Sequence, residues 1–159
     1  IIIFNEGSFL FPVRSFNRLE LELIKILGKE KAGELLKNIG RFQVEQAIKR
    51  YVKLLGMNEL EKDKILRLAK DIISMLGVGK FKIYQKDEKS FEIEFEPYTI
   101  FSFEALKEYG KLDFNFDFLI SGMFEKGFES IYGGEFQCEE ISCYAKGDEK
   151  CKFVCKKKE

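Results

Sequence analysis

Apolar residues recur at intervals of three and four over most of the first half of the chain, which predicts amphipathic helices. The first helix is predicted to begin at the candidate N-cap Ser15 and to end at Gly28. Its apolar stripe consists of Leu19, Leu23 and Leu27. A second helix is predicted over residues 31–55, with Gly40 as a candidate interruption and Gly56 as the stop.

A third helix is predicted to begin near Asn58, because Glu61 follows three residues later in the spacing of a capping box. This helix ends at Gly77, and its apolar stripe consists of Ile65, Ala69, Ile72 and Leu76. Ahead of the first helix, two short apolar runs within residues 1–13 flank the polar segment 5–8 and predict a hairpin.

The apolar period changes to strict alternation after Lys80, which predicts strands. A lysine separates Phe81 from Ile83, and single glutamates separate the apolar residues of the next segment, which are Phe91, Ile93 and Phe95. The polar turn 86–89 joins the two segments. We therefore expect an antiparallel hairpin whose solvent face sets lysine against glutamate.

The rest of the chain predicts two more helices and two more strands. A short helix is expected near 102–109 and a longer one over 115–132, whose apolar face consists of Phe116, Ile120, Phe124, Phe128 and Ile131. Two final strands, over 135–145 and 150–156, join through the turn 146–149. Together the elements predict an α+β fold, with helices packed on one face of a small antiparallel sheet, as one domain that spans the whole chain.

Composition narrows the classes of function. Lysine plus arginine and aspartate plus glutamate both number 27, so the net charge is zero and neither nucleic acid nor an anionic membrane is indicated as a partner. The longest apolar runs are too short to cross a bilayer, and no signal peptide is visible, so we expect a cytoplasmic protein. Since the chain begins with Ile1 rather than methionine, we also expect sequence upstream of it.

The sequence contains no motif that by itself indicates catalysis. The chain has no histidine, which excludes every triad that uses an imidazole base. Residues 77–80 resemble the end of a phosphate loop but lack its first glycine and its hydroxyl residue. No nicotinamide or flavin fingerprint is present. We therefore expect a protein without catalytic chemistry of its own.

All four cysteines fall within residues 138–155. In a reducing compartment such a cluster favours metal binding, and inert buried thiols or a cross-strand disulfide are the alternatives. Cys143 and Cys151 would come together across a hairpin that turns at 147–148. Glu140 and Cys143 would face opposite sides of a regular strand, so a shared ion requires a bulge or bend between them.

A run of spaced residues near the C-terminus resembles the C-terminal signature of the 4-vinyl reductase domain family. The run is Glu140-x-x-Cys143-x-x-x-Gly147-Asp148-x-x-Cys151-x-Phe153, and the predicted long helix before it carries Ser121-Gly122 and Gly127-Phe128. The close match covers about residues 117–153. This family includes archaeal proteins and hydrocarbon-sensing domains of bacterial regulators. Its fold is similar to that of TRAPP vesicle-tethering subunits, which implies helices on a four-stranded antiparallel sheet and a homodimer.

The resemblance also implies a structural zinc site. Phenol-sensing members of the family hold zinc with the glutamate and two cysteines of this signature and with a cysteine on the preceding helix. The corresponding residues here are Glu140, Cys143, Cys151 and Asp117. Because Asp117 replaces a cysteine, a site of two sulfurs and two oxygens is implied, with Cys138 or Cys155 as substitutes for Asp117. Four protein ligands leave no position for water, so the metal would be structural.

The same resemblance implies a pocket for a hydrophobic small molecule. The histidine and tryptophan that hold phenol in phenol-sensing members are absent here, so we expect selection by apolar shape. The candidate lining residues, with the tyrosine as a polar anchor, are Phe95, Tyr98, Phe101, Phe116, Phe124 and Phe128. A stripe of phenylalanines at helical spacing is also the ordinary pattern of a packed core.

Three functions are compatible with these observations. The favoured one is a non-catalytic binding domain that senses or carries a hydrophobic compound. The alternative is an assembly or tethering protein similar to TRAPP subunits. The least favoured is a component of a vinyl-tetrapyrrole reductase, because a partner would then have to supply the electrons.

Overall fold

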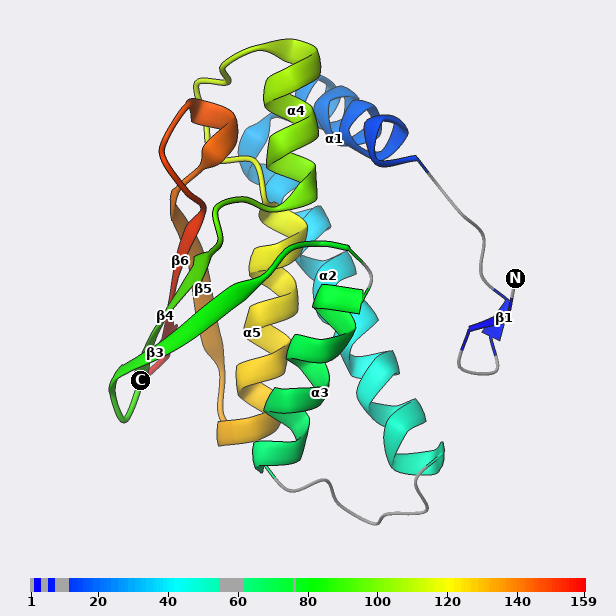
Figure 1. The fold of residues 1–159 in the computed structure, drawn as a ribbon, viewed down its shortest axis with the longest axis vertical. Coiled ribbons are helices and arrows are strands. Elements are labelled where there is room, and N and C mark those ends of the chain that lie inside the picture. The colour runs from blue at the N-terminus through cyan, green and yellow to red at the C-terminus, as the bar shows by residue number, and fades with distance from the viewer. Residues whose placement is uncertain (1, 4–5, 8–11, 55–61, 76) are drawn as a thin grey trace.

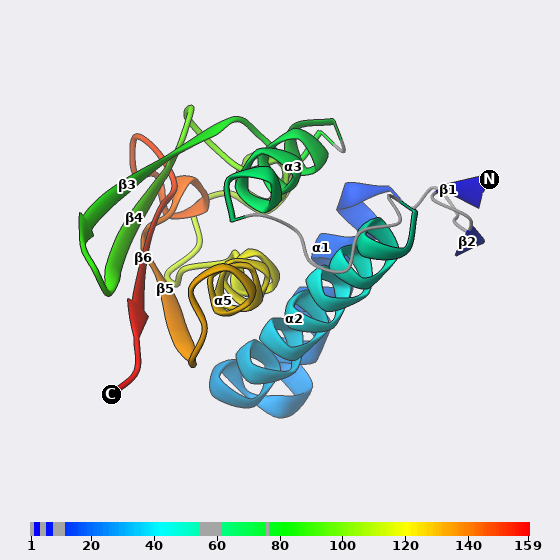
Figure 2. The same cartoon turned by 90° about the horizontal axis from the view of Figure 1, so that it is seen from below.

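The helices of this protein lie on one face of a four-stranded antiparallel sheet (Figure 1 and Figure 2). The computed structural model describes residues 2–3, 6–7, 12–54, 62–75 and 77–159. The helices are α1 (Val13–Leu27), α2 (Lys29–Leu54), α3 (Lys62–Met75), α4 (Ile100–Tyr109) and α5 (Phe118–Tyr132). The strands of the sheet are β3 (Phe81–Asp87), β4 (Ser90–Phe95), β5 (Phe136–Ser142) and β6 (Lys152–Lys157). The predicted α+β fold with a small four-stranded sheet is confirmed.

The strand order β3-β4-β6-β5 places the last strand of the chain between β4 and β5. Alternate residues of β5 and β6 face the helices, and the buried ones are Phe136, Cys138, Glu140, Phe153 and Cys155. Across the hairpin of β3 and β4, Lys86 Nζ lies 3.0 Å from Glu92 Oε2, in the predicted pairing of lysine with glutamate. Within the described ranges, no helix is both long enough and apolar enough to cross a membrane.

Helix α5 lies between the sheet and α2, and its aromatic side chains fill the core (Figure 2). Phe128 stacks on Phe91 of β4 with ring centroids 4.5 Å apart. Phe124 meets Phe153 of β6 edge to face at 5.5 Å. Burying one such side chain contributes about 2–3 kcal/mol, and the ring geometry adds to this. The apolar stripe predicted on the long helix therefore packs against the sheet.

The backbones of α2 and α5 approach closely at two glycines. A Cβ atom at Gly40 of α2 would collide with the carbonyl oxygen of Leu119, and a Cβ atom at Gly122 of α5 would collide with that of Lys37. The prediction that Gly40 interrupts the helix is wrong, because α2 continues through it. A glycine stands there because the contact leaves no room for a side chain.

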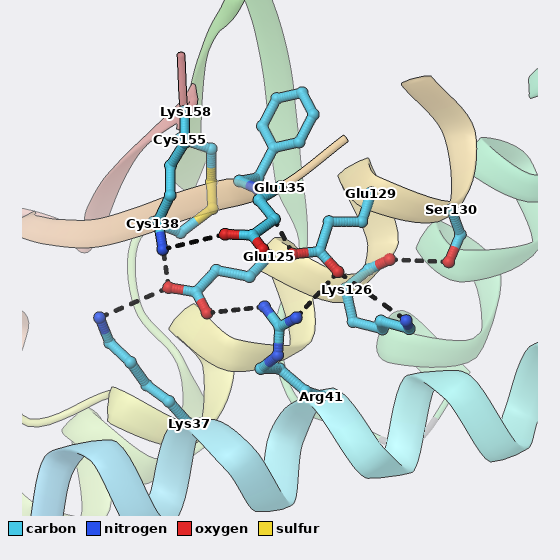
Figure 3. Close-up of polar contacts among 11 residues, drawn as sticks. Lys37, Arg41, Glu125, Lys126, Glu129, Ser130, Glu135, Cys138, Cys155 and Lys158 are labelled. Carbon is cyan, nitrogen blue, oxygen red and sulfur yellow. Dashed lines mark hydrogen bonds and ion pairs between the residues drawn. A yellow bond between two sulfur atoms is a disulfide. The ribbon is translucent and has the colours of Figure 1, made fainter. Parts of the chain in front are cut away.

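An ionic network beside these glycines joins α2 to α5 and to β5 (Figure 3). Arg41 of α2 donates hydrogen bonds to Glu125 and Glu129 of α5 at 3.1 and 2.9 Å. The buried Glu125 also accepts the backbone N–H of Cys138 in β5 at 3.1 Å. Because both glutamates are largely shielded from solvent and bonded on more than one side, the network holds α5 in place against the edge of the sheet.

Some predicted boundaries at the N-terminal end are wrong. Pro12 occupies the N-cap position of α1, and the backbone N–H of Ser15 donates to the Pro12 carbonyl at 3.0 Å, so Ser15 lies inside the helix. Proline suits this place because its fixed φ fits a helix start, where a backbone N–H has no helical partner. Glu6 and Gly7, expected in a turn, form a strand, β2 (Glu6–Gly7), that pairs with β1 (Ile2–Ile3). The predicted helix start at 58–61 lies outside the described residues.

The final hairpin also differs from its prediction. Strand β5 ends at Ser142, and a short 3₁₀-helix, η1 (Tyr144–Lys146), follows before β6 begins at Lys152. Cys143 and Cys151 were predicted on adjacent strands, but both lie in the connection just beyond the strand ends. The connection is therefore longer than a tight turn, and it carries its own hydrogen bonds.

The contact at Gly122 generates a stability prediction. We expect Gly122→Ala to lower the free energy of unfolding by about 3 kcal/mol, because α2 and α5 must move apart to admit a methyl group. Urea denaturation followed by circular dichroism measures the change.

The matched control is Gly127→Ala on the same helix, where an added Cβ meets nothing within 4 Å. This control should leave stability unchanged or raise it by about 0.5–1 kcal/mol, since alanine favours the helix. Equal effects of the two substitutions would contradict the close-contact explanation.

Candidate metal centre and apolar cavity

Four thiol and carboxyl side chains meet in one buried place, near the N-terminal end of α5 and the connection from β5 to β6. They are Asp117, Glu140, Cys143 and Cys151, and we call them the acidic cluster. One potential ligand atom from each lies within 4.8 Å of the others, and all four residues are buried. The fold thus brings together the four residues to which the family resemblance assigned zinc ligation.

Asp117 occupies the N-cap position of α5 but does not cap the helix. An aspartate there ordinarily accepts a backbone N–H of the first helical turn, which contributes about 1 kcal/mol. Instead, both oxygens of its carboxylate lie within hydrogen-bond distance of the Thr99 hydroxyl, at 2.9 and 2.7 Å. Thr99 is itself the N-cap of α4 and accepts the backbone N–H of Ser102 at 3.1 Å. The Asp117 side chain is therefore held in the cluster at the expense of its own helix.

An irregularity in β5 brings Glu140 and Cys143 to the same side. The register of β5 against β6 shifts between Glu140 and Ser142, and Ile141 between them is 55% exposed. In a regular strand the odd offset would put Glu140 and Cys143 on opposite faces. The shift supplies the bend that a shared site requires, as the sequence predicted.

The glycine and aspartate of the signature shape the connection that carries the two cysteines. Gly147 has a φ of 92°, in the left-handed region that residues with a side chain rarely adopt. The Asp148 carboxylate accepts the backbone N–H of Cys143 at 2.8 Å. These features fold the chain back after η1, so that Cys151 returns to the position of Cys143. The spacing of the signature therefore has a structural reason.

Hydrogen-bond donors around Cys151 favour its thiolate. The Cys143 thiol donates to it, the Ser102 hydroxyl oxygen lies 3.1 Å from its sulfur, and the amide nitrogen of Tyr144 lies 3.4 Å away. These contacts, that of Cys143 first, lower the pKa of Cys151 to about 6 against the opposing effect of burial. The same hydrogen bond raises the pKa of Cys143, which keeps the proton.

The two carboxyl groups of the cluster are disfavoured as anions. Burial, followed by the charge of Cys151, raises the pKa of Glu140 to about 8. Burial, followed by the charge of Glu140, raises the pKa of Asp117 well above its usual value. Glu140 Oε2 accepts the backbone N–H of Asp117 at 3.1 Å, but its buried Oε1 has no hydrogen-bond partner in the described part of the chain. The cluster lacks a positive charge that a divalent cation would supply.

The other two cysteines form a disulfide between β5 and β6. Cys138 and Cys155 stand directly opposite each other in the sheet and are covalently bonded. The expectation that a reducing compartment favours metal ligands over disulfides is therefore wrong for this pair, and neither residue can substitute for Asp117. Cys143 and Cys151 are free thiols.

A second candidate site is an apolar cavity of about 50 Å³ between α2, α3, α5 and β3. Two of the predicted pocket residues, Phe124 and Phe128, line it. Val44 of α2, Ala69 of α3 and Phe81 of β3 form the other sides.

The other four predicted pocket residues do not line this cavity. They pack against aromatic neighbours, in the pairs Phe95 with Phe153, Tyr98 with Phe103, Phe101 with Phe16 and Phe116 with Phe114. Phe95 and Phe116 are fully buried in this packing. Contact of any of the six residues with a ligand stays a prediction.

Sequence reasoning missed three residues near the cluster. Thr99 and Ser102 have the spacing of a helix cap at the start of α4, a signal that was available in the sequence. Glu20 of α1 is 2% exposed, its Oε1 has no partner among the described residues, and burial, followed by the charge of Glu140, raises its pKa. No sequence signal distinguishes Glu20, because its burial depends on how α1 packs.

Comparison with solved structures shows where else this fold occurs. The phenol-responsive sensory domain of the transcription activator PoxR with phenol is similar at a TM-score of 0.78 and 16% identity, over 96% of this chain and 78% of that one. Trafficking protein particle complex subunit 3 from Naegleria fowleri, covalently bound to palmitic acid, is similar at 0.60 and 16% identity, over 92% and 95%. A vinyl-4-reductase family protein from Methanocaldococcus jannaschii is similar at 0.57 and 16% identity, over 96% and 85%.

Comparison of sequences gives the family. No curated protein sequence matches the chain. The family model of the 4-vinyl reductase domain matches residues 106–157, a range that includes the whole acidic cluster. This match confirms the resemblance inferred from the spacing of Glu140 to Phe153, and through residues 106–157 the chain belongs to the 4-vinyl reductase domain family.

Proposed function

We propose that this protein is a non-catalytic domain that binds a hydrophobic small molecule, as a sensor or a carrier. The observation that carries the proposal is the apolar cavity between α2, α3, α5 and β3. Two proteins of the same fold support it by the compounds in their structures, which are phenol for one and palmitic acid for the other. Both compounds have an apolar body, which suits a pocket lined by aliphatic and aromatic side chains.

The size of the cavity limits how a ligand enters. At about 50 Å³ it is smaller than the roughly 150 Å³ apolar cavity that accepts benzene in an engineered protein. A ring-sized ligand must therefore displace lining side chains or shift α3, which supplies Leu66, Ala69 and Ile73 to one wall. Binding should accordingly select by shape and be coupled to a movement of α3 relative to α5.

Ligand binding should raise the melting temperature, because a ligand selective for the folded state stabilises it. We expect phenol, toluene or palmitate, at about 100 times its dissociation constant, to add about 2.7 kcal/mol to the free energy of unfolding. Thermal denaturation with each compound measures this effect.

Ala69→Phe fills the cavity and should abolish the shift. Lys70→Ala, at an exposed position next to it on α3, should not. If no compound of this panel shifts the transition, or if Ala69→Phe leaves the shift unchanged, the cavity is not the binding site.

We also propose that the acidic cluster holds a structural zinc ion. Ligands of one tetrahedral zinc lie about 3.3–3.8 Å apart, given bonds of about 2.0–2.3 Å, so the four atoms need only a small contraction from their present separations. Two thiolates and two carboxylates suit this borderline ion. Glu140 Oε1, which lacks a partner in the described residues, would gain one. The ion would tie the start of α5 to the connection between β5 and β6.

Elemental analysis should find one zinc per chain in the purified protein, and none in Cys143→Ser or Cys151→Ser. Removing the ion with a chelator should lower the melting temperature by more than about 5 °C, because metal binding free energy is folding free energy.

The matched control for the zinc measurement is Cys138→Ala/Cys155→Ala, which removes the disulfide and should keep the zinc. Circular dichroism identifies any variant that fails to fold. A folded parent without metal after growth in zinc, or folded serine variants that both keep it, would exclude this site.

A second candidate function, assembly, is favoured by exposed apolar side chains on α1 and α2. The most exposed are Ile26 of α1 at 75% and Phe42 of α2 at 61%. On α2 the stripe continues through Leu35 and Ile39, at intervals of four and three residues. The two helices lie side by side, away from the sheet (Figure 2). We propose that a second copy of the chain covers this face, since a surface bordered by both charge signs can pair with itself across a two-fold axis.

Analytical ultracentrifugation should show a dimer at micromolar concentration, and Ile39→Glu/Phe42→Glu should convert it to a monomer. Ile141→Glu is the control, because Ile141 is similarly exposed but lies on β5. A monomeric parent, or dissociation by the control substitution as well, would contradict the assignment of this face.

A further inference from the structure

A polar groove of about 310 Å³ opens beside the acidic cluster. Its walls come from α2, the start of α5 and β5. Asp117 and Glu140 border the groove, whereas neither cysteine of the cluster does. An ion held by the four residues would therefore present its carboxylate side to the groove.

Protein covers the sulfur side of the cluster. Cys143 and Cys151 have no exposed surface. The Ser102 hydroxyl and the Tyr144 amide lie against the Cys151 sulfur at 3.1 and 3.4 Å. Neighbouring Ala105 is likewise fully buried. Solvent and small ligands should therefore reach a bound ion from the groove.

Two lysines of α2 give the groove a positive wall. Lys29 Nζ lies 5.9 Å from the centre of the Phe114 ring and has no acidic partner at ion-pair distance among the described residues. Lys37 Nζ lies 3.5 Å from Glu125 Oε1 and also borders the groove. Outside the cluster, the acidic residue in the groove lining is the exposed Glu139.

Metal loading would change the charge that the groove presents. Without an ion, the carboxyl groups of Asp117 and Glu140 face two lysines. A divalent cation would neutralise these carboxylates, leaving Lys29 and Lys37 against Glu139, with the cation behind them. The complementary ligand is then a small anion, and zinc can take a fifth ligand. Charged hydrogen bonds from lysine to carboxylate or phosphate oxygens are among the stronger ones in proteins.

We propose that this groove is a metal-dependent binding site for a small carboxylate or phosphate anion. The proposal rests on the metal centre proposed above and goes beyond it, since it gives the ion a ligand from solution in addition to its structural role. It also gives a consequence to the exchange of a cysteine for Asp117, because the side of the ion that faces the groove is then lined by oxygen rather than sulfur.

The test uses the protein loaded with Co²⁺, whose visible spectrum reports coordination number, after free metal has been removed by dialysis. Acetate and inorganic phosphate are titrated separately. Each should change the cobalt absorption in a saturable way, while the cobalt content stays at one per chain. In Lys29→Ala and in Lys37→Ala the dissociation constant of the anion should rise about fivefold to tenfold, whereas Lys49→Ala, farther along α2 and paired with Glu45, should match the parent.

The outcomes separate this proposal from the metal site itself. If Co²⁺ binds with the intensity of a four-coordinate site and neither anion alters its spectrum, the groove proposal is wrong and the metal centre stands. If Lys49→Ala weakens the anion as much as Lys29→Ala does, the effect is general electrostatics and the groove is again excluded. If no Co²⁺ binds, the metal centre fails first.

Discussion

The close contact between the backbones of α2 and α5 is the constraint on which the rest of the structure depends. Gly40 and Gly122 allow it, because any side chain at either position would meet a carbonyl group of the other helix. With α2 behind it, α5 presses its aromatic face onto the sheet, and Arg41 fixes it through Glu125 and Glu129. The N-terminal end of α5 then stands beside the connection between β5 and β6.

That position explains how local structure gives way to the acidic cluster. Asp117 does not cap its own helix, and β5 breaks its register after Glu140. The cluster also gathers groups that burial makes costly to ionise, and it leaves Glu140 Oε1 without a partner in the described residues. Each departure has a physical cost, and a bound cation is the single explanation that would offset all three.

The division of the four cysteines follows from the same geometry. Cys138 and Cys155 are directly opposed in regular strands, where side chains on one face come within bonding distance. Cys143 and Cys151 lie beyond the strand ends, where the hydrogen bond from the Cys143 amide to Asp148 holds them next to the carboxylates. One pair thus staples the sheet, and the other pair belongs to the cluster.

The sequence by itself determined the fold class, the strands of both hairpins to within a few residues, and the four members of the cluster, because period, glycines and signature spacing are local properties. It also required a bend between Glu140 and Cys143, since strand parity follows from chain geometry alone. Only the tertiary structure decided that Cys138 bonds Cys155, that Gly40 is a contact rather than a break, and that Glu20 is buried. It also decided that four of the six predicted pocket phenylalanines and tyrosines pack elsewhere than in the cavity. These outcomes depend on which distant segments meet, and chain-local patterns carry no information about that.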